Sequence, residues 1–169
     1  WVMGMPDLSF YPEFYLKNNA FDNPVAFGQA HKADIQEYIK IANLELLDYE
    51  AAKPEIEAAL KSGDPWKRYW GLIVCSRFQE KANEFLPLIK KLAKTDAELI
   101  NRVRAAEFMG ITKTGDPTKI ICATLYQSKD AVEALLILNS VVLLQDGYGY
   151  SFKIEMKKLD QNVGNDSQV

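Results

Sequence analysis

Two arginines stand at matching places in a repeated sequence pattern. Asp64 begins the first copy and is followed by Arg68, while Asp96 begins the second copy and is followed by Arg102. The two arginines are 34 residues apart, a spacing typical of stacked helical repeats. A guanidinium can bind a carboxylate through two parallel hydrogen bonds, so we expect Arg68 and Arg102 to contact carboxylates or helix-end carbonyls within the chain.

Anion binding is the alternative use of these arginines. Together with Arg104 and Lys67, they could form a basic stripe that binds a sulfated sugar. The nearby Trp66, Tyr69 and Trp70 could form a platform for a sugar ring, but their helical spacing favours core packing, and Trp66 is the member best placed for exposure. Pairing between repeats is the favoured use. The binding candidates are Trp66, Arg68, Arg102 and Arg104, and the candidates for a structural role in the repeats are Asp64, Arg68, Asp96, Arg102 and Asp116.

Side chains that bind metals or act as nucleophiles are few. His31 is the single histidine, and Cys75 and Cys122 are 47 residues apart, which is not a zinc-ligand spacing. We therefore expect no metal site, a surface or capping role for His31, and buried free thiols rather than a disulfide.

Pairs of carboxylates could serve acid–base chemistry. Glu50 is close in sequence to Glu55 and Glu57, and Glu98 and Glu107 fall on one predicted helix. An acid–base pair also needs a cleft that shifts the pKa of one member, which helical spacing alone does not supply. We interpret these glutamates as solvated faces of helices.

The composition is that of one folded domain. The chain has 169 residues, of which 48% are hydrophobic and 25% are charged, with a net charge of -3. Duplex binding is driven by clustered Lys and Arg, so this acidic balance argues against a nucleic-acid partner. The longest apolar runs, 135–138 and 140–144, are too short and interrupted for a membrane span.

The elements that carry these side chains are predicted to be paired helices. The 34-residue spacing and the amphipathic periodicity around it predict an all-α fold, specifically a HEAT-like α-α superhelix (an α-solenoid) of about seven core helices within residues 32–147. The predicted helices cover about 32–47, 48–62, 65 onward, 83–94, 95–110, 116–126 and 128–144.

Capping residues predict where the helices begin. Asp64–Pro65 combines an N-cap with a proline in the first turn, and Asp116–Pro117 repeats the device. Thr95 and Glu98 are spaced as a capping box, and Ser128 is predicted to cap the last long helix. In that helix the residues predicted to point inward are Val132, Leu135, Leu138 and Val142, and residues 145–147 are predicted to end it.

The two flanks differ from the repeat region. Residues 1–31 form an aromatic, proline-containing arm that is extended or short-helical, and residues 148–169 form a second, non-repeat arm. The first arm either wraps the first helix pair as a cap or docks on a neighbouring domain. The chain opens without an initiator methionine, which suggests a segment of a longer precursor. The candidates for contact with another domain are Trp1, Phe10, Tyr11, Phe14 and Tyr15.

Four stretches resemble a known family. They are 5–13 (Met-Pro-Asp-Leu-Ser-Phe-Tyr-Pro-Glu), 23–29, 68–72 (Arg-Tyr-Trp-Gly-Leu) and 101–110, which contains Val-Arg-Ala-Ala. Together they resemble the C-terminal region of Bacteroidetes-type sulfatases, where a HEAT-like extension follows an alkaline-phosphatase-like catalytic domain. The resemblance implies a module that packs on the catalytic domain of the same polypeptide and shapes its substrate cleft.

The resemblance does not carry catalysis into this chain. It implies that the parent hydrolyses sulfate esters with calcium and a formylglycine made from a Cys/Ser-x-Pro-x-Arg motif, in the periplasm or outside the cell. Cys75 is followed by Ser76 and Arg77, and Cys122 by Ala123 and Thr124, so no proline stands where that motif needs one. We expect neither catalytic residues nor a cofactor in this segment.

Two other classes of protein remain as alternatives. One is a freestanding HEAT-like scaffold that binds a protein on its concave face. The other is a HEAT-like DNA glycosylase, which requires a basic groove that the acidic composition disfavours. A tetratricopeptide array also has a 34-residue period, but the order Trp70-Gly71-Leu72 does not match its signature.

Overall fold

The described part of the molecule is built of helices. The computed structural model describes residues 7–20 and 22–164, and within these ranges there are helices and connecting segments but no strand. The predicted all-α class is confirmed. The α-helices are α1 (Glu13–Asn19), α2 (Pro24–Ala30), α3 (Lys32–Ala42), α4 (Tyr49–Leu60), α5 (Pro65–Phe78), α6 (Leu86–Thr95), α7 (Leu99–Ile111), α8 (Thr118–Leu125), α9 (Ala131–Tyr148) and α10 (Gln161–Gly164). Short 3-10 helices cover Leu8–Phe10, Asn43–Leu46, Gln79–Phe85 and Met156–Lys158.

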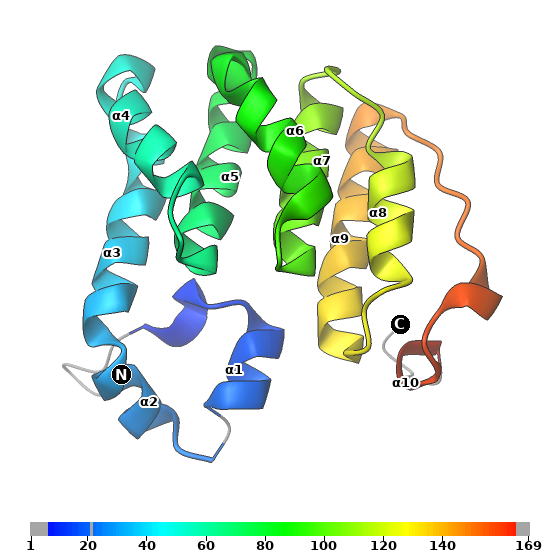
Figure 1. Ribbon diagram of the computed structural model, residues 1–169, viewed down its shortest axis with the longest axis horizontal. Helices are drawn as coiled ribbons and strands as arrows, with labels where there is room; N and C mark the ends of the chain where they lie inside the picture. Colours follow the sequence, from blue (N-terminus) through cyan, green and yellow to red (C-terminus); the bar gives the residue numbers. More distant parts are fainter. Residues whose placement is uncertain (1–6, 21, 165–169) are drawn as a thin grey trace.

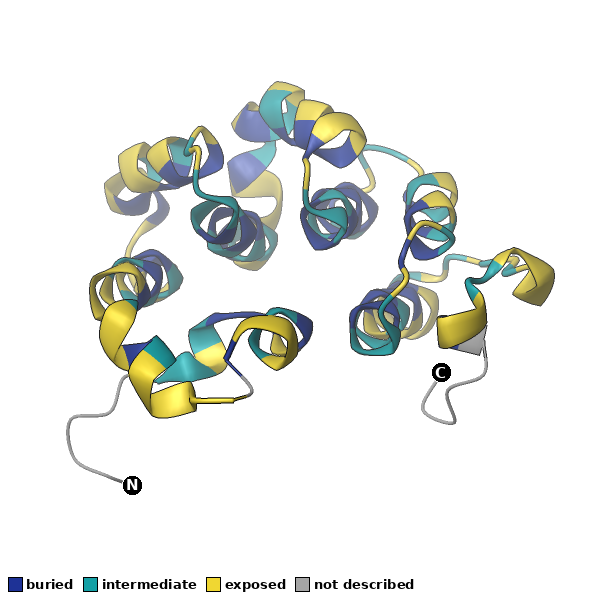
Figure 2. Cartoon of the chain, turned by 60° about the horizontal axis from the view of Figure 1, so that its bottom comes forward, coloured by how far each residue is buried: buried dark blue, intermediate teal, exposed yellow. Residues whose placement is uncertain are grey.

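The helices lie in two layers. α3, α5, α7 and α9 lie side by side, each packed against the next, while α4, α6 and α8 pack on them from the other side (Figure 1). Figure 2 shows that the layers bend, with the N-terminal helices on the inner side of the bend. Helices that alternate along the chain therefore share a layer, and one side of α5, α7 and α9 faces inward.

Buried apolar side chains form two clusters. Between the layers, Ile56, Leu72 and Phe108 are completely buried. A β-carbon on Gly71 would lie 3.1 Å from the Cβ of Ala59, so the absence of a side chain here lets α4 and α5 approach closely. The second cluster lies on the inner side and is rich in aromatic rings, many of them from the N-terminal arm.

The N-terminal arm lies across the inner side of the layers. Nε1 of Trp70 donates to the backbone oxygen of Phe10 at 2.8 Å, and Nδ2 of Asn18 donates to Oδ2 of Asp130 at 3.2 Å. The arm is short-helical, as predicted, and it reaches from α3 to α9 rather than covering the first helix pair alone (Figure 1). Trp1 lies outside the described residues.

The two Asp-Pro pairs both act at helix starts, in different registers. Oδ1 of Asp64 accepts the backbone N–H of Trp66 at 2.8 Å, and α5 begins at Pro65 as predicted. At α8 the proline precedes the first helical residue, and Oδ1 of Asp116 accepts the backbone N–H of Thr118 at 2.9 Å.

The predicted capping box before α7 is wrong. The Thr95 hydroxyl donates to the backbone oxygen of Lys91 at 3.0 Å, one turn back in α6. Oδ1 of Asp96 instead accepts the backbone N–H of Glu98 at 3.0 Å. Adjacent Thr and Asp residues compete for the same donors, and the carboxylate is the stronger acceptor.

The predicted cap of α9 is also wrong. Oδ1 of Asp130 accepts the backbone N–H groups of Val132 at 2.8 Å and Glu133 at 3.0 Å. The Ser128 hydroxyl donates to Oε2 of Glu133 at 2.7 Å. Ser128 therefore contacts α9 through the Glu133 side chain, and Asp130, two residues later, is the N-cap.

Two other predicted helices have different bounds. The helix predicted over 32–47 is α-helical only to Ala42 and then tightens into the turn Asn43–Leu46. The helix predicted over 83–94 is a 3-10 segment to Phe85 followed by α6. In both places amphipathic spacing continues through a change of helix type, which periodicity does not reveal.

α9 differs most from its prediction. It continues through residues 145–147 to Tyr148, and Gly149 then takes a φ of 73°, the left-handed conformation of a helix C-terminus. The residues predicted to point inward are half-buried or exposed, and Val142 is 56% exposed. The apolar residues that are buried are Ala134, Ile137, Val141 and Leu144. A helix that is apolar around its whole circumference has no period that marks its buried face.

By length and composition, α9 could also span a membrane. Its 18 residues have a mean hydropathy of 1.3, and 33% of them are buried. The prediction that the apolar runs are too short considers 135–138 and 140–144 separately, whereas the helix joins them. α9 packs against α7 and α8, the arrangement of a core helix.

After α9 the chain follows an irregular path beside α8 (Figure 1). The Tyr150 hydroxyl donates to the backbone oxygen of Gly110 at 3.1 Å, and the ammonium of Lys113 lies 4.2 Å from the centroid of the Tyr150 ring. These contacts hold the start of this segment against the end of α7.

Candidate functional site

Arg68 and Asp96 form a buried ion pair at one end of the layers. Nε and Nη2 of Arg68 donate to the two carboxylate oxygens of Asp96 at 2.7 and 2.9 Å, and the Asp96 side chain has no exposed area. Nη1 of Arg68 donates to the backbone oxygens of Ser62 at 2.9 Å and Gly63 at 3.1 Å. Hydrogen bonding to Asp96 raises the pKa of Arg68, which stays charged.

Arg102 reaches the same place from α7. Its Nε donates to the backbone oxygen of Asp96 at 2.6 Å, and Nη1 donates to Oε1 of Gln127 at 3.3 Å. Arg68 and Arg102 thus make the contacts with carboxylates and helix-end carbonyls that we expect from the sequence. We call this group of residues the Asp96 junction: Ser62, Gly63, Arg68, Asp96 and Arg102. It joins the end of α4 to α5, α6 and α7.

Arg104 lies on the inner side of α7, away from the Asp96 junction. Its Nη1 donates to Oε2 of Glu107 at 2.8 Å and to Oγ of Ser140 at 3.3 Å. The Arg104 and Glu107 side chains are only 15% and 8% exposed, and the guanidinium carbon lies 5.6 Å from the Tyr69 ring centroid. The Nε of Arg104 is buried without a hydrogen-bond partner among the described residues. The Arg104 guanidinium is therefore hydrogen-bonded less completely than the Arg68 guanidinium of the Asp96 junction.

The basic stripe considered for sulfated sugars is not formed. Arg102 and Arg104 are two residues apart on one helix, so they face different sides of it. Trp66 packs in the core, the use that its helical spacing favours: its side chain is 4% exposed and its ring centroid lies 4.7 Å from that of Tyr15 in the arm. Periodicity along α5 contains no sign that a distant segment covers this residue.

The arm uses its aromatic side chains within the chain. Tyr11 and Phe14 are buried, Phe10 packs on Trp70 with centroids 5.2 Å apart, and Tyr15 stacks on Tyr11 at 5.3 Å. Burial raises the pKa of Tyr11 to about 12. These four candidates for contact with another domain therefore contact the chain's own inner side.

Only some of the glutamates that we interpret as solvated are exposed. Glu50 and Glu55 are exposed, but Glu107 is buried in its pair with Arg104. Burial, with the nearby Asp96 charge, raises the pKa of Glu98. Burial also raises the pKa of Glu133, helped by the charges of Asp130 and Glu98 and opposed by the Ser128 hydrogen bond.

A cavity of about 510 Å³ lies between the arm, α5 and α9. We call it the aromatic hollow. Its walls are apolar, with Phe14 and Leu16 from the arm, Tyr69 and Trp70 from α5, and Val132, Leu135 and Leu136 from α9. Pockets of this size with mostly apolar walls and few polar groups are the usual form of a binding site.

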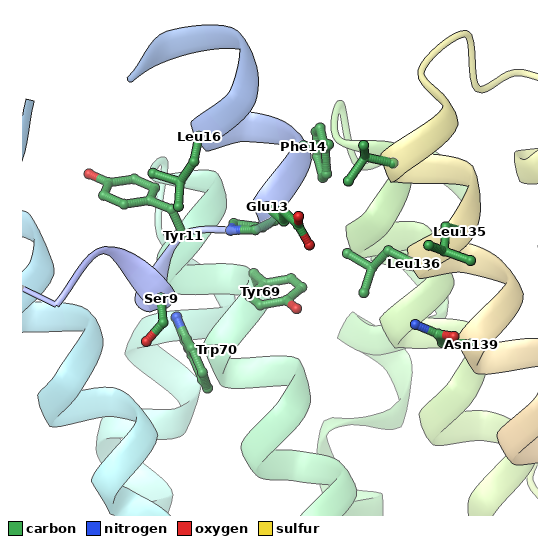
Figure 3. Close-up of a pocket in the computed structure, with 12 residues that line it drawn as sticks. Ser9, Tyr11, Glu13, Phe14, Leu16, Tyr69, Trp70, Leu135, Leu136 and Asn139 are labelled. Atoms are coloured by element: carbon green, nitrogen blue, oxygen red, sulfur yellow. The ribbon is translucent and has the colours of Figure 1, made fainter. Parts of the chain in front are cut away.

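Few polar groups line the aromatic hollow. Figure 3 shows Glu13 of the arm and the Tyr69 hydroxyl extending toward Leu136 and Asn139 of α9. Glu13 takes part in none of the salt bridges between described residues. The hollow therefore offers an exposed carboxylate above apolar walls.

A second cavity, of about 380 Å³, continues along the inner side toward the end of α9. We call it the arginine hollow. Arg77, Arg104 and Glu107 line it together with Ile73 and Leu143. The aromatic hollow is lined by residues nearer the start of α5 and α9, and the arginine hollow by residues further along the same two helices. We call the two hollows together the inner cleft.

The cysteines and the histidine lie away from the inner cleft. Both thiols are free, as predicted, and Cys75 is buried while Cys122 is only half-buried. Burial raises the pKa of Cys75 to about 12, and it also raises that of Cys122. Nδ1 of His31 lies 3.2 Å from Oδ2 of Asp34 at the surface. Within residues 7–20 and 22–164, no three His, Cys, Asp or Glu side chains are grouped to hold a metal ion.

Reasoning from the sequence found Arg104 but missed Glu13, Leu136 and Asn139. The missed residues come from two segments more than a hundred residues apart, which the fold brings together. The one available signal was that α9 has more apolar residues than a single buried face requires. Comparison with known proteins gives no matching family model, no matching curated protein and no matching solved structure.

Proposed function

We propose that this chain is a noncatalytic module of a larger sulfatase-type hydrolase and that it binds the catalytic domain of the same polypeptide through the inner cleft. The observation that carries the proposal is the cleft itself, because apolar side chains of α5 and α9, most of them half-buried, line its walls. An apolar cleft of this kind is suited to binding another folded domain. The family is proposed from the sequence resemblance.

The finer architecture we propose is a HEAT-like α-solenoid. Three features support it: alternate helices share a layer, the layers bend, and an Asp-to-Arg pattern recurs at 34 residues. The Asp96 junction has the position of a contact between neighbouring repeats, since it ties the end of one helix pair to the start of the next.

The noncatalytic role is supported by the state of the nucleophilic groups. A thiol with a pKa of about 12 is protonated near neutral pH, and Cys75 is completely buried. Neither cysteine stands in the Cys/Ser-x-Pro-x-Arg pattern. The proposal therefore assigns calcium, formylglycine and ester hydrolysis to the catalytic domain, and a periplasmic or secreted location to the whole parent.

The test compares the chain with its parent. We expect residues 1–169 alone not to hydrolyse an aryl sulfate, the full polypeptide to hydrolyse it, and deletion of residues 1–169 to lower the stability or substrate selectivity of the parent. An unchanged parent after deletion, or a coding sequence without an upstream Cys/Ser-x-Pro-x-Arg motif, contradicts the proposal.

A freestanding protein-binding scaffold is the second candidate, and the same apolar cleft favours it. The two are separated by the upstream coding sequence, because the scaffold requires no catalytic domain there. A DNA glycosylase is disfavoured, since the chain has a net charge of -3 and the exposed charge in the aromatic hollow is a carboxylate.

A further inference from the structure

The N-terminal arm is attached in different ways at its two ends. Near its start, Phe10 packs on Trp70 and the Tyr11 side chain is buried among aromatic rings. At its far end, α1 is joined to the start of α9 by a hydrogen bond between exposed side chains, from Nδ2 of Asn18 to Oδ2 of Asp130 at 3.2 Å. Between α1 and α9 lies the aromatic hollow (Figure 3). The α1 end of the arm is therefore the end that can move.

The Asp130 carboxylate holds two elements at once. Its Oδ1 accepts the first N–H groups of α9, from Val132 and Glu133, and its Oδ2 accepts the Asn18 amide of α1. Burial opposes the ionised form, but these hydrogen bonds and the Lys17 charge hold the pKa of Asp130 below its ordinary value. A movement of Asp130 would therefore disturb the start of α9 and the end of the arm together.

A buried hydroxyl connects Asp130 to a second carboxyl group. Oγ of Ser128, a completely buried residue, lies 2.7 Å from Oε2 of Glu133 and 3.2 Å from the backbone oxygen of Asp130. A hydroxyl has one proton, so it donates one full hydrogen bond. An ionised Glu133 takes that proton, whereas a protonated Glu133 donates to Oγ and leaves the hydroxyl free to bind Asp130. Both contacts are full hydrogen bonds only when Glu133 is protonated.

The surroundings of Glu133 also favour its neutral form. Its side chain is 8% exposed, and the charges acting on it are the carboxylates of Asp130 on its own turn and Glu98 at the start of α7. Burial, with these two charges, raises the pKa of Glu133. The cations of neighbouring elements act elsewhere, since Lys17 of α1 acts on Asp130 and Arg102 of α7 binds within the Asp96 junction. α10 contains no ionisable side chain.

We infer that Glu133 is a pH-dependent latch for the arm: when protonated it holds α1 against the start of α9, and when ionised it releases α1 and opens the aromatic hollow. An ionised carboxylate requires water or a counter-charge, and Glu133 reaches water only if the turn 128–130 moves. Repulsion between the Glu133 and Asp130 carboxylates acts in the same direction. The bond from Asn18 is lost as Asp130 moves, while the aromatic end of the arm stays in place.

Opening of this latch changes the walls of the aromatic hollow. Glu13, Phe14 and Leu16 line the hollow from α1, opposite Val132 and the other lining residues of α9. Release of α1 moves the first three away from the α9 wall. The latch thus makes access to the hollow depend on pH, and it is independent of the proposed function because it needs no partner.

Hydrogen exchange of the backbone amides, followed by mass spectrometry on residues 1–169, tests the latch. Protection factors, which are corrected for the intrinsic effect of pH on exchange, should fall about tenfold in α1 between pH 5 and pH 8. A tenfold change corresponds to a pKa about one unit higher in the closed arm than in the open arm. Dilute urea should leave the protection of α1 unchanged, because a local opening exposes little surface.

Three matched variants separate the latch from a general effect of pH. Glu133→Gln carries a neutral amide that donates to Ser128 at every pH, so α1 should stay protected from pH 5 to pH 8. Asn18→Ala removes the bond to Asp130 and should lower the protection of α1 at every pH. Glu55→Gln, on the exposed side of α4, should behave as the wild type does.

An independent measurement on the wild type follows the carboxyl carbon of Glu133 by NMR. Its titration midpoint should lie above the ordinary value of 4.5 and coincide with the midpoint of the loss of protection in α1. A midpoint at or below 4.5, protection of α1 that is constant with pH, or an equal loss in Glu133→Gln would overturn the latch. So would a urea-sensitive loss shared by α1 and α7, which indicates global unfolding. Aryl sulfate hydrolysis by the parent enters none of these results, so the proposed function is tested separately.

Discussion

Two arginine–carboxylate pairs of this molecule have the same chemistry and different surroundings. In the Asp96 junction, every nitrogen of the Arg68 guanidinium donates to a carboxylate or carbonyl oxygen of the chain. In the inner cleft, Arg104 is paired with Glu107, but its buried Nε has no described partner. The first pair connects helices, and the second lines a cavity.

The hydrogen-bonding groups around a buried ion pair determine how much the pair stabilises the fold. A buried pair stabilises a fold when additional hydrogen bonds offset the loss of hydration, and otherwise apolar residues do as well. Arg68 has those additional bonds from the end of α4. We therefore expect the two pairs to respond differently to substitution, and the following experiments test that expectation.

Removing the carboxylate of the Asp96 junction should have the largest effect. Asp96→Ala leaves Arg68 partly buried without its counter-charge and removes the acceptor for the Glu98 N–H. We expect a loss of about 4 kcal/mol in the free energy of unfolding, measured by urea denaturation. The control Asp116→Ala removes an exposed acceptor at the start of α8 and should lose about 1 kcal/mol. Equal losses would contradict the comparison.

Double substitutions should separate the pairs next. Arg104→Met alone should lose about 3 kcal/mol, because Glu107 would remain buried and unpaired, while Arg104→Met combined with Glu107→Leu should return to within about 1 kcal/mol of the wild type. The matched double variant Arg68→Met with Asp96→Leu should not recover, since the Ser62 and Gly63 carbonyls also lose their donor. Recovery of both doubles would show that the pairs are equivalent.

Glu133 should have a smaller effect on the stability of the fold, and one that depends on pH. Its pKa is raised above the ordinary value of 4.5, chiefly by burial, so the folded state binds a proton more tightly than the unfolded state. The stabilisation is complete below the unfolded pKa and is lost as pH rises through the folded pKa. Glu133→Gln should therefore be more stable than wild type at pH 7 and vary less with pH. Urea midpoints from pH 4 to pH 8 give the measurement, and a steeper dependence would contradict it.

An exposed ion pair should have the smallest effect. Nζ of Lys61 lies 2.5 Å from Oε1 of Glu57 with 62% and 47% of the side chains exposed. Lys61→Ala should change the free energy of unfolding by less than about 0.5 kcal/mol, and less still in high salt. A loss in the free energy of unfolding as large as that of Arg104→Met would show that burial does not determine the order of these effects.

The sequence predicts this molecule best where the interactions are local. The helical class, the start of α5 at Pro65 and the contacts of Arg68 and Arg102 follow from caps, periodicity and spacing. It fails at Ser128 and Thr95, where neighbouring polar residues compete for one helix end and the tertiary contacts decide.

The inner cleft could not be predicted, because it depends on distant contacts. Glu107 has the spacing of a solvated position, yet it is buried in its pair with Arg104, and the spacing of Trp66 does not reveal that the arm covers it. The inward face of α9 has no period that marks it. The sequence makes Arg104 a candidate for binding, but the groups that surround its side chain belong to α5 and α9.

The arm that crosses the inner side has a consequence for the order of folding. Asn18 binds Asp130 across 112 residues of sequence, and Phe10 binds Trp70 across 60. Contacts so distant in sequence require closure of long loops, which slows their formation. On the ribosome the arm emerges more than a hundred residues before its partner on α9. The arm is therefore synthesised well before it can reach its final place.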